Sequence, residues 1–130
     1  MRVHAWNNKE VKTCSDKARQ AFIDAGLDYG ILWYSSLNIL LRRVNDCLKK
    51  HGEDHPDFQM HARQWKIVEG SGGRIKSAFL EVDGPYFEKR EAISFNSDGW
   101  IGFAGWACTE NAEPFTNAFL LWVKECASSD

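Results

Sequence analysis

The sequence lacks a hydrophobic run of the length that crosses a membrane. No stretch approaches the roughly 18 consecutive apolar residues that a spanning helix requires, and the first residues, MRVHAWNNKEVK, lack the long apolar centre of a secretion signal. The four cysteines are widely spaced and form no Cys-x-x-Cys pair. Without an export signal, such thiols are expected to stay reduced. The sequence therefore predicts a cytoplasmic protein with no membrane partner.

The chain also lacks an excess of basic charge. It carries 16 Lys and Arg residues against 18 Asp and Glu residues, which gives a formal net charge of −2. A dedicated nucleic-acid binder is usually basic or has a clear basic stripe, so direct binding of nucleic acid is not expected. The Gly-Ser-Gly-Gly run at 70–73 lacks the Gly-x4-Gly-Lys-Ser/Thr pattern of a phosphate loop. No cofactor is predicted.

What the chain has in abundance is aromatic side chains, gathered in Ala92–Val123. This stretch holds three of the six tryptophans and four of the eight phenylalanines, so we expect it to form the core. With 130 residues the chain has the size of one domain. We predict a helical half at about 7–69, a glycine-rich connection at 70–73, and a β-hairpin with a C-terminal helix at 74–126.

Apolar residues recur at three- and four-residue steps in the first half, which is typical of helices. One predicted helix covers Val11–Ala25. A second carries the stripe from Trp33 to Leu48 and is expected to stop at Gly52. A third is expected to begin at Pro56 and to continue to about residue 69.

Alternating residues predict three strands in the second half, at Arg74–Val82, Glu91–Phe95 and Trp100–Trp106. The segment Tyr86–Glu91 is expected to be a loop or an exposed edge. A final helix is expected to begin near Pro114. The order α-α-α-β-β-β-α predicts an α+β fold, in which a small antiparallel sheet packs against helices.

Two groups of residues are candidates for binding a partner. Trp100 and Trp106 are six residues apart on one predicted strand, so they would share a face. Either helices cover that face, or it is open and the two rings fill a partner's pocket. The second group is the charged segment with Tyr86, Glu88, Lys89, Arg90 and Glu91.

Metal-ligating residue types gather in one region: Cys47, His51, His55 and His61. The spacing Cys-x3-His-x3-His would place ligands on one helical face, but Gly52 and Pro56 are expected to interrupt the helix. A loop could still fold these side chains around zinc. The alternative is that His51 caps a helix end, while His55 and His61 lie at the surface or are half-buried.

Cys108 precedes the final predicted helix. A helix N-terminus can lower the pKa of a thiol and make it nucleophilic. The alternative is a small, half-buried thiol with no chemical role.

The closing segment ISFNSDGWIGFAGWACTENAEPFTNAFLLWV, at Ile93–Val123, resembles small accessory proteins of phage and prophage genomes. The resemblance implies a protein that acts in the host cytoplasm by binding a host component, such as a defence or transcription protein. It assigns no functional residue.

Three hypotheses remain open. The first is a non-enzymatic binding protein, which could be a phage-encoded inhibitor of a CRISPR or restriction-type defence complex. The second is a small cysteine- or metal-dependent enzyme. The third is a homodimer that pairs through the strand Arg74–Val82, taken as an edge, or through the helix that carries Trp33.

Overall fold

The computed structural model describes residues 34–96, 101–108 and 111–128, together with Asp16, Gln20, Ile23 and Asp24. Its regular elements are α2 (Tyr34–Asp54), β1 (His61–Glu69), β2 (Ile75–Gly84), β3 (Phe87–Asn96), β4 (Ile101–Phe103) and α3 (Ala112–Ser128). Short 3₁₀ turns lie at Pro56–Phe58, Ser71–Gly73 and Gly105–Cys108. The expected helix at Val11–Ala25 falls almost entirely outside the described residues.

Helix α2 confirms the expected apolar stripe. Its inward positions are at most 1% exposed: Leu37, Leu40, Val44 and Leu48. The helix does not stop at Gly52, because the backbone N–H of His55 still donates to the carbonyl of His51 at 2.9 Å. Gly52 is buried, and the Gln59 side-chain amide donates to its carbonyl at 2.8 Å. This bond satisfies a carbonyl in the last turn that has no partner within the helix, because the residue four positions on, Pro56, has no N–H.

The expected third helix over 56–69 is wrong. Pro56 begins only a single 3₁₀ turn, and His61–Glu69 forms the strand β1. Two side-chain contacts hold the strand against α2: the Trp65 indole N–H donates to the Leu37 carbonyl at 2.9 Å, and Asn45 bonds to the backbone of Ala62. Pairing with β2 and burial against α2 therefore override a helical spacing that the local sequence also allows.

One antiparallel sheet contains all four strands in the order β1-β2-β3-β4. One of the apolar rows that cross it joins all four described strands, because Trp65 lies opposite Leu80, Leu80 opposite Ile93, and Ile93 opposite Phe103. The class is α+β, but the predicted order α-α-α-β-β-β-α is wrong: from residue 34 on, the described elements run α-β-β-β-β-α. The glycine run 70–73 therefore joins two strands, with Gly72 at φ +70° in the turn.

The strand β2 occupies an interior position between β1 and β3. Both of its edges are thus already hydrogen-bonded, and the expected dimer through Arg74–Val82 as an edge strand is wrong. The other expected dimer contact, the helix that carries Trp33, corresponds to α2; Trp33 itself lies outside the described residues, and pairing through this helix stays a prediction.

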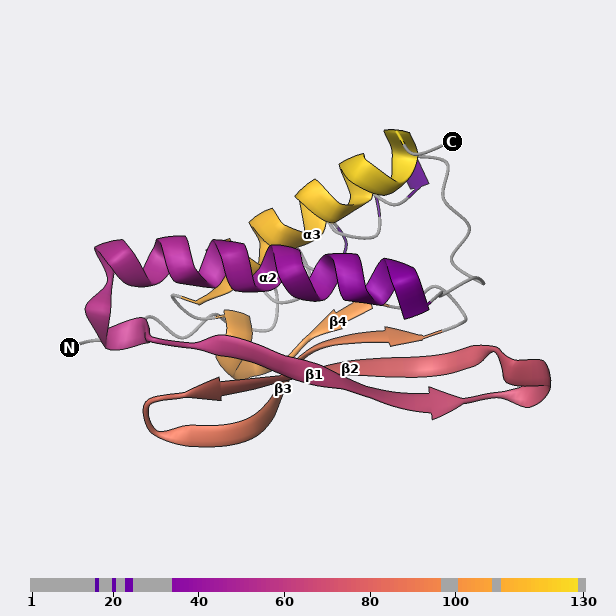
Figure 1. The fold of residues 1–130 in the computed structure, drawn as a ribbon, viewed down its shortest axis with the longest axis horizontal. Coiled ribbons are helices and arrows are strands. Elements are labelled where there is room, and N and C mark those ends of the chain that lie inside the picture. The colour runs from indigo at the N-terminus through magenta and orange to yellow at the C-terminus, as the bar shows by residue number, and fades with distance from the viewer. Residues whose placement is uncertain are drawn as a thin grey trace.

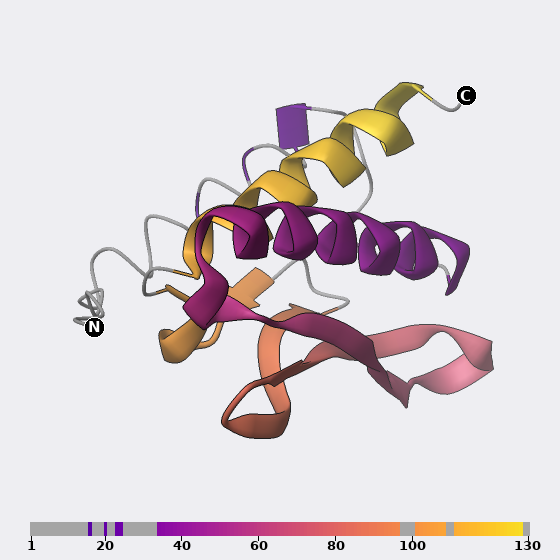
Figure 2. The same cartoon turned by 60° about the vertical axis from the view of Figure 1, so that its left-hand side comes forward.

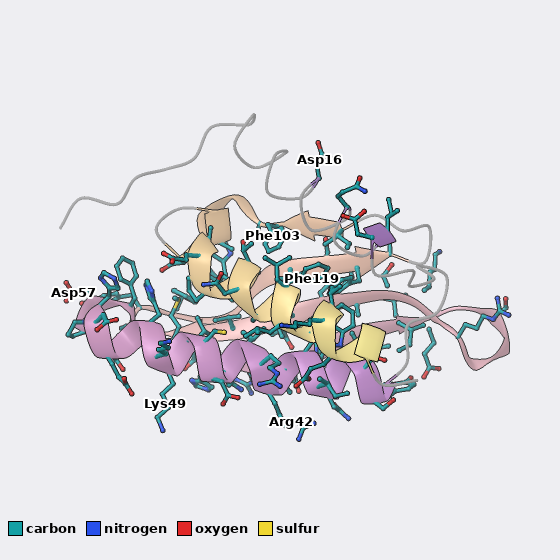
Figure 3. The ribbon with its side chains drawn as sticks, turned by 90° about the horizontal axis from the view of Figure 1, so that it is seen from above. Asp16, Arg42, Lys49, Asp57, Phe103 and Phe119 are labelled. Atoms are coloured by element: carbon teal, nitrogen blue, oxygen red, sulfur yellow. The ribbon has the colours of Figure 1, made fainter. Side chains whose placement is uncertain are left out.

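The helices α2 and α3 cover the same face of the sheet, so these described elements form two layers (Figures 1 and 2). Arg43 of α2 forms an ion pair with Glu125 of α3. Between the layers the Phe95 ring lies 5.8 Å from the Phe119 ring and 5.7 Å from the Trp122 ring, as measured between centroids. Viewed from above, Arg42 and Lys49 project from the outer side of α2, away from α3 (Figure 3).

The sheet face away from the helices is mostly polar. Because successive strand residues point to opposite faces, the neighbours of the buried row share this second face. They lie in register across the sheet: Lys66, Phe79, Ser94 and Gly102. On β4 only Gly102 points to this side, while Ile101 and Phe103 are buried against the helices.

Candidate functional site

The tip of the hairpin between β2 and β3 is the most exposed aromatic feature of the described residues. Gly84 and Phe87 lie opposite each other in the register, so only Pro85 and Tyr86 form the turn. The Tyr86 side chain is 95% exposed. A large aromatic side chain at a protruding tip can enter a pocket on a partner with little loss of conformational freedom.

Phe87 folds back over the turn. A Cβ atom at Gly84 would lie 2.6 Å from Cζ of the Phe87 ring, so the ring occupies the space that any other residue at 84 would need. The guanidinium of Arg90 lies over the same ring, 5.4 Å from its centroid. The residues next to the turn residue Tyr86 are therefore packed against one another; we call Gly84, Phe87 and Arg90 the base of the tip.

Trp106 joins this base to the core. Its ring meets Phe87 edge-on at 5.1 Å between centroids and meets Phe115 of α3 at 6.2 Å. Its indole N–H donates to the Glu91 carbonyl at 2.8 Å. Trp106 is half-buried and lies in the 3₁₀ turn Gly105–Cys108, so the expectation that it lies on the last strand is wrong: β4 ends at Phe103. Trp100 lies outside the described residues.

The backbone beside the tip is strained. Lys89 has φ +54°, a left-handed conformation that is uncommon for a residue with a side chain. The register shifts between Val82 and Gly84, and the Lys89 N–H donates to Oδ1 of Asp83 at 2.8 Å. The other oxygen of Asp83 lies 3.6 Å from Arg63 Nη1 and 3.6 Å from His61 Nε2. Asp83 therefore fixes the irregular segment to β1.

The charged segment that the sequence singles out surrounds this tip. Phe87–Glu91 is the first part of β3 rather than a loop. The polar side chains are all exposed: Glu88, Lys89, Arg90 and Glu91. Neither Asp83 nor Phe87 is a candidate on the sequence alone, although both define the tip. The Gly84-Pro85 dipeptide followed by two aromatic residues is the signal that could have identified Phe87.

A groove of about 640 Å³ lies between the C-terminal part of α2 and the start of α3. Cys47, His51 and His55 line its α2 side, and Glu113 and Leu121 line its α3 side. The His51 and His55 rings are 4.4 Å apart between centroids. His61 borders a different groove with Gln59 and Met60. Among the described residues, no three His, Cys, Asp or Glu side chains are placed to hold one metal ion.

Two cysteines, Cys47 and Cys108, are candidates for thiol chemistry. Burial raises the pKa of the Cys47 thiol, and the neighbouring Asp46 carboxylate raises it further. A raised pKa leaves less of the reactive thiolate at neutral pH, which disfavours Cys47 as a nucleophile. Cys108 lies in the 3₁₀ turn Gly105–Cys108, and its side chain is outside the described part.

Comparisons with known proteins give no relative. No protein-family model matches the chain, and neither a curated protein nor a solved structure matches it significantly. Of the helices in the described part of the chain, none combines the length and the apolar composition that a membrane span requires.

Proposed function

We propose that this protein acts by binding another protein, and that the tip of the β2–β3 hairpin makes the central contact. The observation that carries the proposal is the 95% exposure of Tyr86 on a base held by Phe87, Trp106 and Asp83. Tyrosine is enriched among the residues that dominate binding energy. A tip that is already rigid loses little conformational entropy when it binds.

The strain at Lys89 is a second support. Residues held in sparsely populated backbone conformations cluster at ligand contacts and other functional positions. Lys89 carries an exposed cationic side chain three residues after Tyr86, and Arg90 adds a second exposed cation. Glu88 and Glu91 supply acidic groups, so this surface can select a partner by complementary charge as well as by shape.

The partner class that we propose is a host protein in the bacterial cytoplasm, with inhibition of a CRISPR or restriction-type complex as the specific case. This part of the proposal rests on the resemblance of Ile93–Val123 to phage and prophage accessory proteins.

The proposal is tested with immobilised protein and bacterial lysate, followed by mass spectrometry. Tyr86→Ala should lose the proteins that the wild type captures. The matched control is Val68→Ala, which removes another exposed apolar side chain (41% exposed) from β1, outside the hairpin. Equal capture by the wild type and Tyr86→Ala, or no specific capture by the wild type, would contradict the proposal.

The alternative is a small cysteine- or metal-dependent enzyme. It is favoured by the groove that gathers Cys47, His51 and His55. The raised pKa of the Cys47 thiol argues against the version with a Cys47 nucleophile. Turnover of generic ester, peptide or phosphoester substrates that is lost in His55→Ala would favour the enzyme.

A further inference from the structure

We propose that His51 and His55 form a binding site for a borderline divalent transition-metal ion, such as Ni²⁺ or Zn²⁺, at the C-terminal end of α2. The two residues are four apart: His51 lies in the last turn of α2, and His55 directly follows the last helical residue, with its N–H still donating to the His51 carbonyl at 2.9 Å. Residues with this spacing lie on the same face of a helix. The continuation through Gly52 is therefore what brings the two imidazoles together.

The distance between the rings suits coordination of one ion. With a metal–nitrogen bond of about 2.1 Å, each ring centroid lies roughly 3.2 Å from the ion, so two rings bound at right angles have centroids roughly 4.5 Å apart. The observed separation is 4.4 Å, with 33° between the ring planes. In the proposed site, rotation about the side-chain bonds directs one nitrogen of each ring to a common point.

The Phe58 ring packs near both histidine rings. Its ring is buried and lies 5.8 Å from the His51 ring and 6.3 Å from the His55 ring. Packing against one fixed ring restricts the rotamers of both histidines. A restricted pair loses less entropy on binding an ion than two free surface side chains would.

The surroundings favour a cation and select its type. The histidines line the groove of about 640 Å³, which has room for an ion with its water ligands. Asp54 of α2 and Glu113 of α3 line the same groove and contribute negative charge, against one lysine, Lys50. Imidazole ligands suit Zn²⁺, Ni²⁺ and Cu²⁺, whereas Mg²⁺ and Ca²⁺ prefer sites made only of oxygen atoms.

The protein supplies two ligands and water supplies the others. This follows because no third His, Cys, Asp or Glu of the described residues converges with them. Cys47 is one further turn back along α2, too far along the axis to share an ion with His55. We therefore expect an exchangeable ion rather than a structural zinc that holds the fold together.

Isothermal titration calorimetry of the full, reduced chain with Ni²⁺ tests the site. The wild type should show saturable binding of one ion, and both His51→Ala and His55→Ala should lose it. His55 is exposed, so its replacement should leave the melting temperature unchanged, and this variant remains informative if His51→Ala fails to fold. The controls are the other two histidines, as His4→Ala and His61→Ala, together with Cys47→Ser.

Each outcome of the titration supports or overturns the proposed metal site. Binding that is lost only in the His51 and His55 variants supports the site. Absence of saturable binding by the wild type, or equal binding by His55→Ala, overturns it. Loss in His61→Ala or Cys47→Ser to the same degree would also overturn it, because the ion would then depend on side chains outside the proposed pair.

Discussion

Asn45 of α2 pairs with the backbone of Ala62 as a neighbouring strand would. Its side-chain Nδ2 donates to the Ala62 carbonyl at 3.1 Å, and the Ala62 N–H donates to its Oδ1 at 2.7 Å. Ala62 is 4% exposed, so these backbone groups have little access to water. The backbone groups at the start of the outer edge of β1 are thereby hydrogen-bonded to a side chain of α2.

Replacing Asn45 should destabilise the fold. Asn45→Ala removes both hydrogen bonds and leaves two nearly buried backbone groups unsatisfied, which should lower the free energy of unfolding by about 1–3 kcal/mol. Urea denaturation followed by circular dichroism measures the change. Asn45→Asp keeps the acceptor but loses the donor, so it should fall between the wild type and the alanine variant. A loss below a few tenths of a kcal/mol for Asn45→Ala would show that water replaces the amide.

The left-handed backbone at Lys89 predicts two opposite effects. Lys89→Gly removes the steric cost of φ +54° but adds chain entropy to the unfolded state, so stability should stay equal or rise by up to about 1 kcal/mol. Lys89→Val places a β-branched residue in the same conformation and should cost about 1 kcal/mol or more. Thermal unfolding of both variants is the measurement. Equal destabilisation by glycine and valine would contradict the assigned conformation.

Gly84 and Phe87 should behave as one unit. Gly84→Ala places a methyl group 2.6 Å from Cζ of the Phe87 ring, which should cost about 1–3 kcal/mol because the ring also packs on Trp106. In a Phe87→Ala background the same change should cost little, since the clash is gone. A double-mutant cycle of unfolding free energies measures this coupling. Additive effects of the two substitutions would exclude the close approach of the ring.

Cys47 should react slowly with thiol reagents near neutral pH. Burial and the Asp46 carboxylate raise its pKa, so at a given pH a smaller fraction is thiolate than in a free cysteine. Because a raised pKa shifts the titration upward, labelling should increase only at alkaline pH. The test is the rate of iodoacetamide labelling against pH in a variant with Cys14, Cys108 and Cys126 replaced by serine. A rate at pH 7 equal to that of a model peptide thiol would contradict the prediction.

Parts of the fold follow from the sequence because one local pattern dominates. The stripe Leu37, Leu40, Val44 is compatible only with a helix, and the apolar face of Phe115–Trp122 predicts α3 for the same reason. The segment His61–Glu69 is ambiguous, because Trp65 and its neighbours fit a helical step as well as an alternating strand. Pairing with β2 decides between the two, and a single sequence does not contain that information.

The site is less accessible to sequence reasoning than the fold. The charged residues around Tyr86 mark a surface, but the exposure of Tyr86 depends on the short turn and on Phe87 folding over Gly84. In the same way, glycine at 52 predicts the end of a helix. The structure shows that α2 continues to Asp54, with the Gln59 amide bonded to the Gly52 carbonyl, and that His51 lies beside His55.

The contact of Trp106 with Phe87 gives the protein an internal optical reporter. Indole emission responds to the neighbouring ring and to the hydrogen bond of its N–H, and both of these belong to the hairpin. Anything that engages the tip and displaces Phe87 should therefore change the fluorescence of Trp106. The difference between the wild type and Trp106→Phe would isolate that signal, so occupancy of the tip could be followed in solution without any attached label.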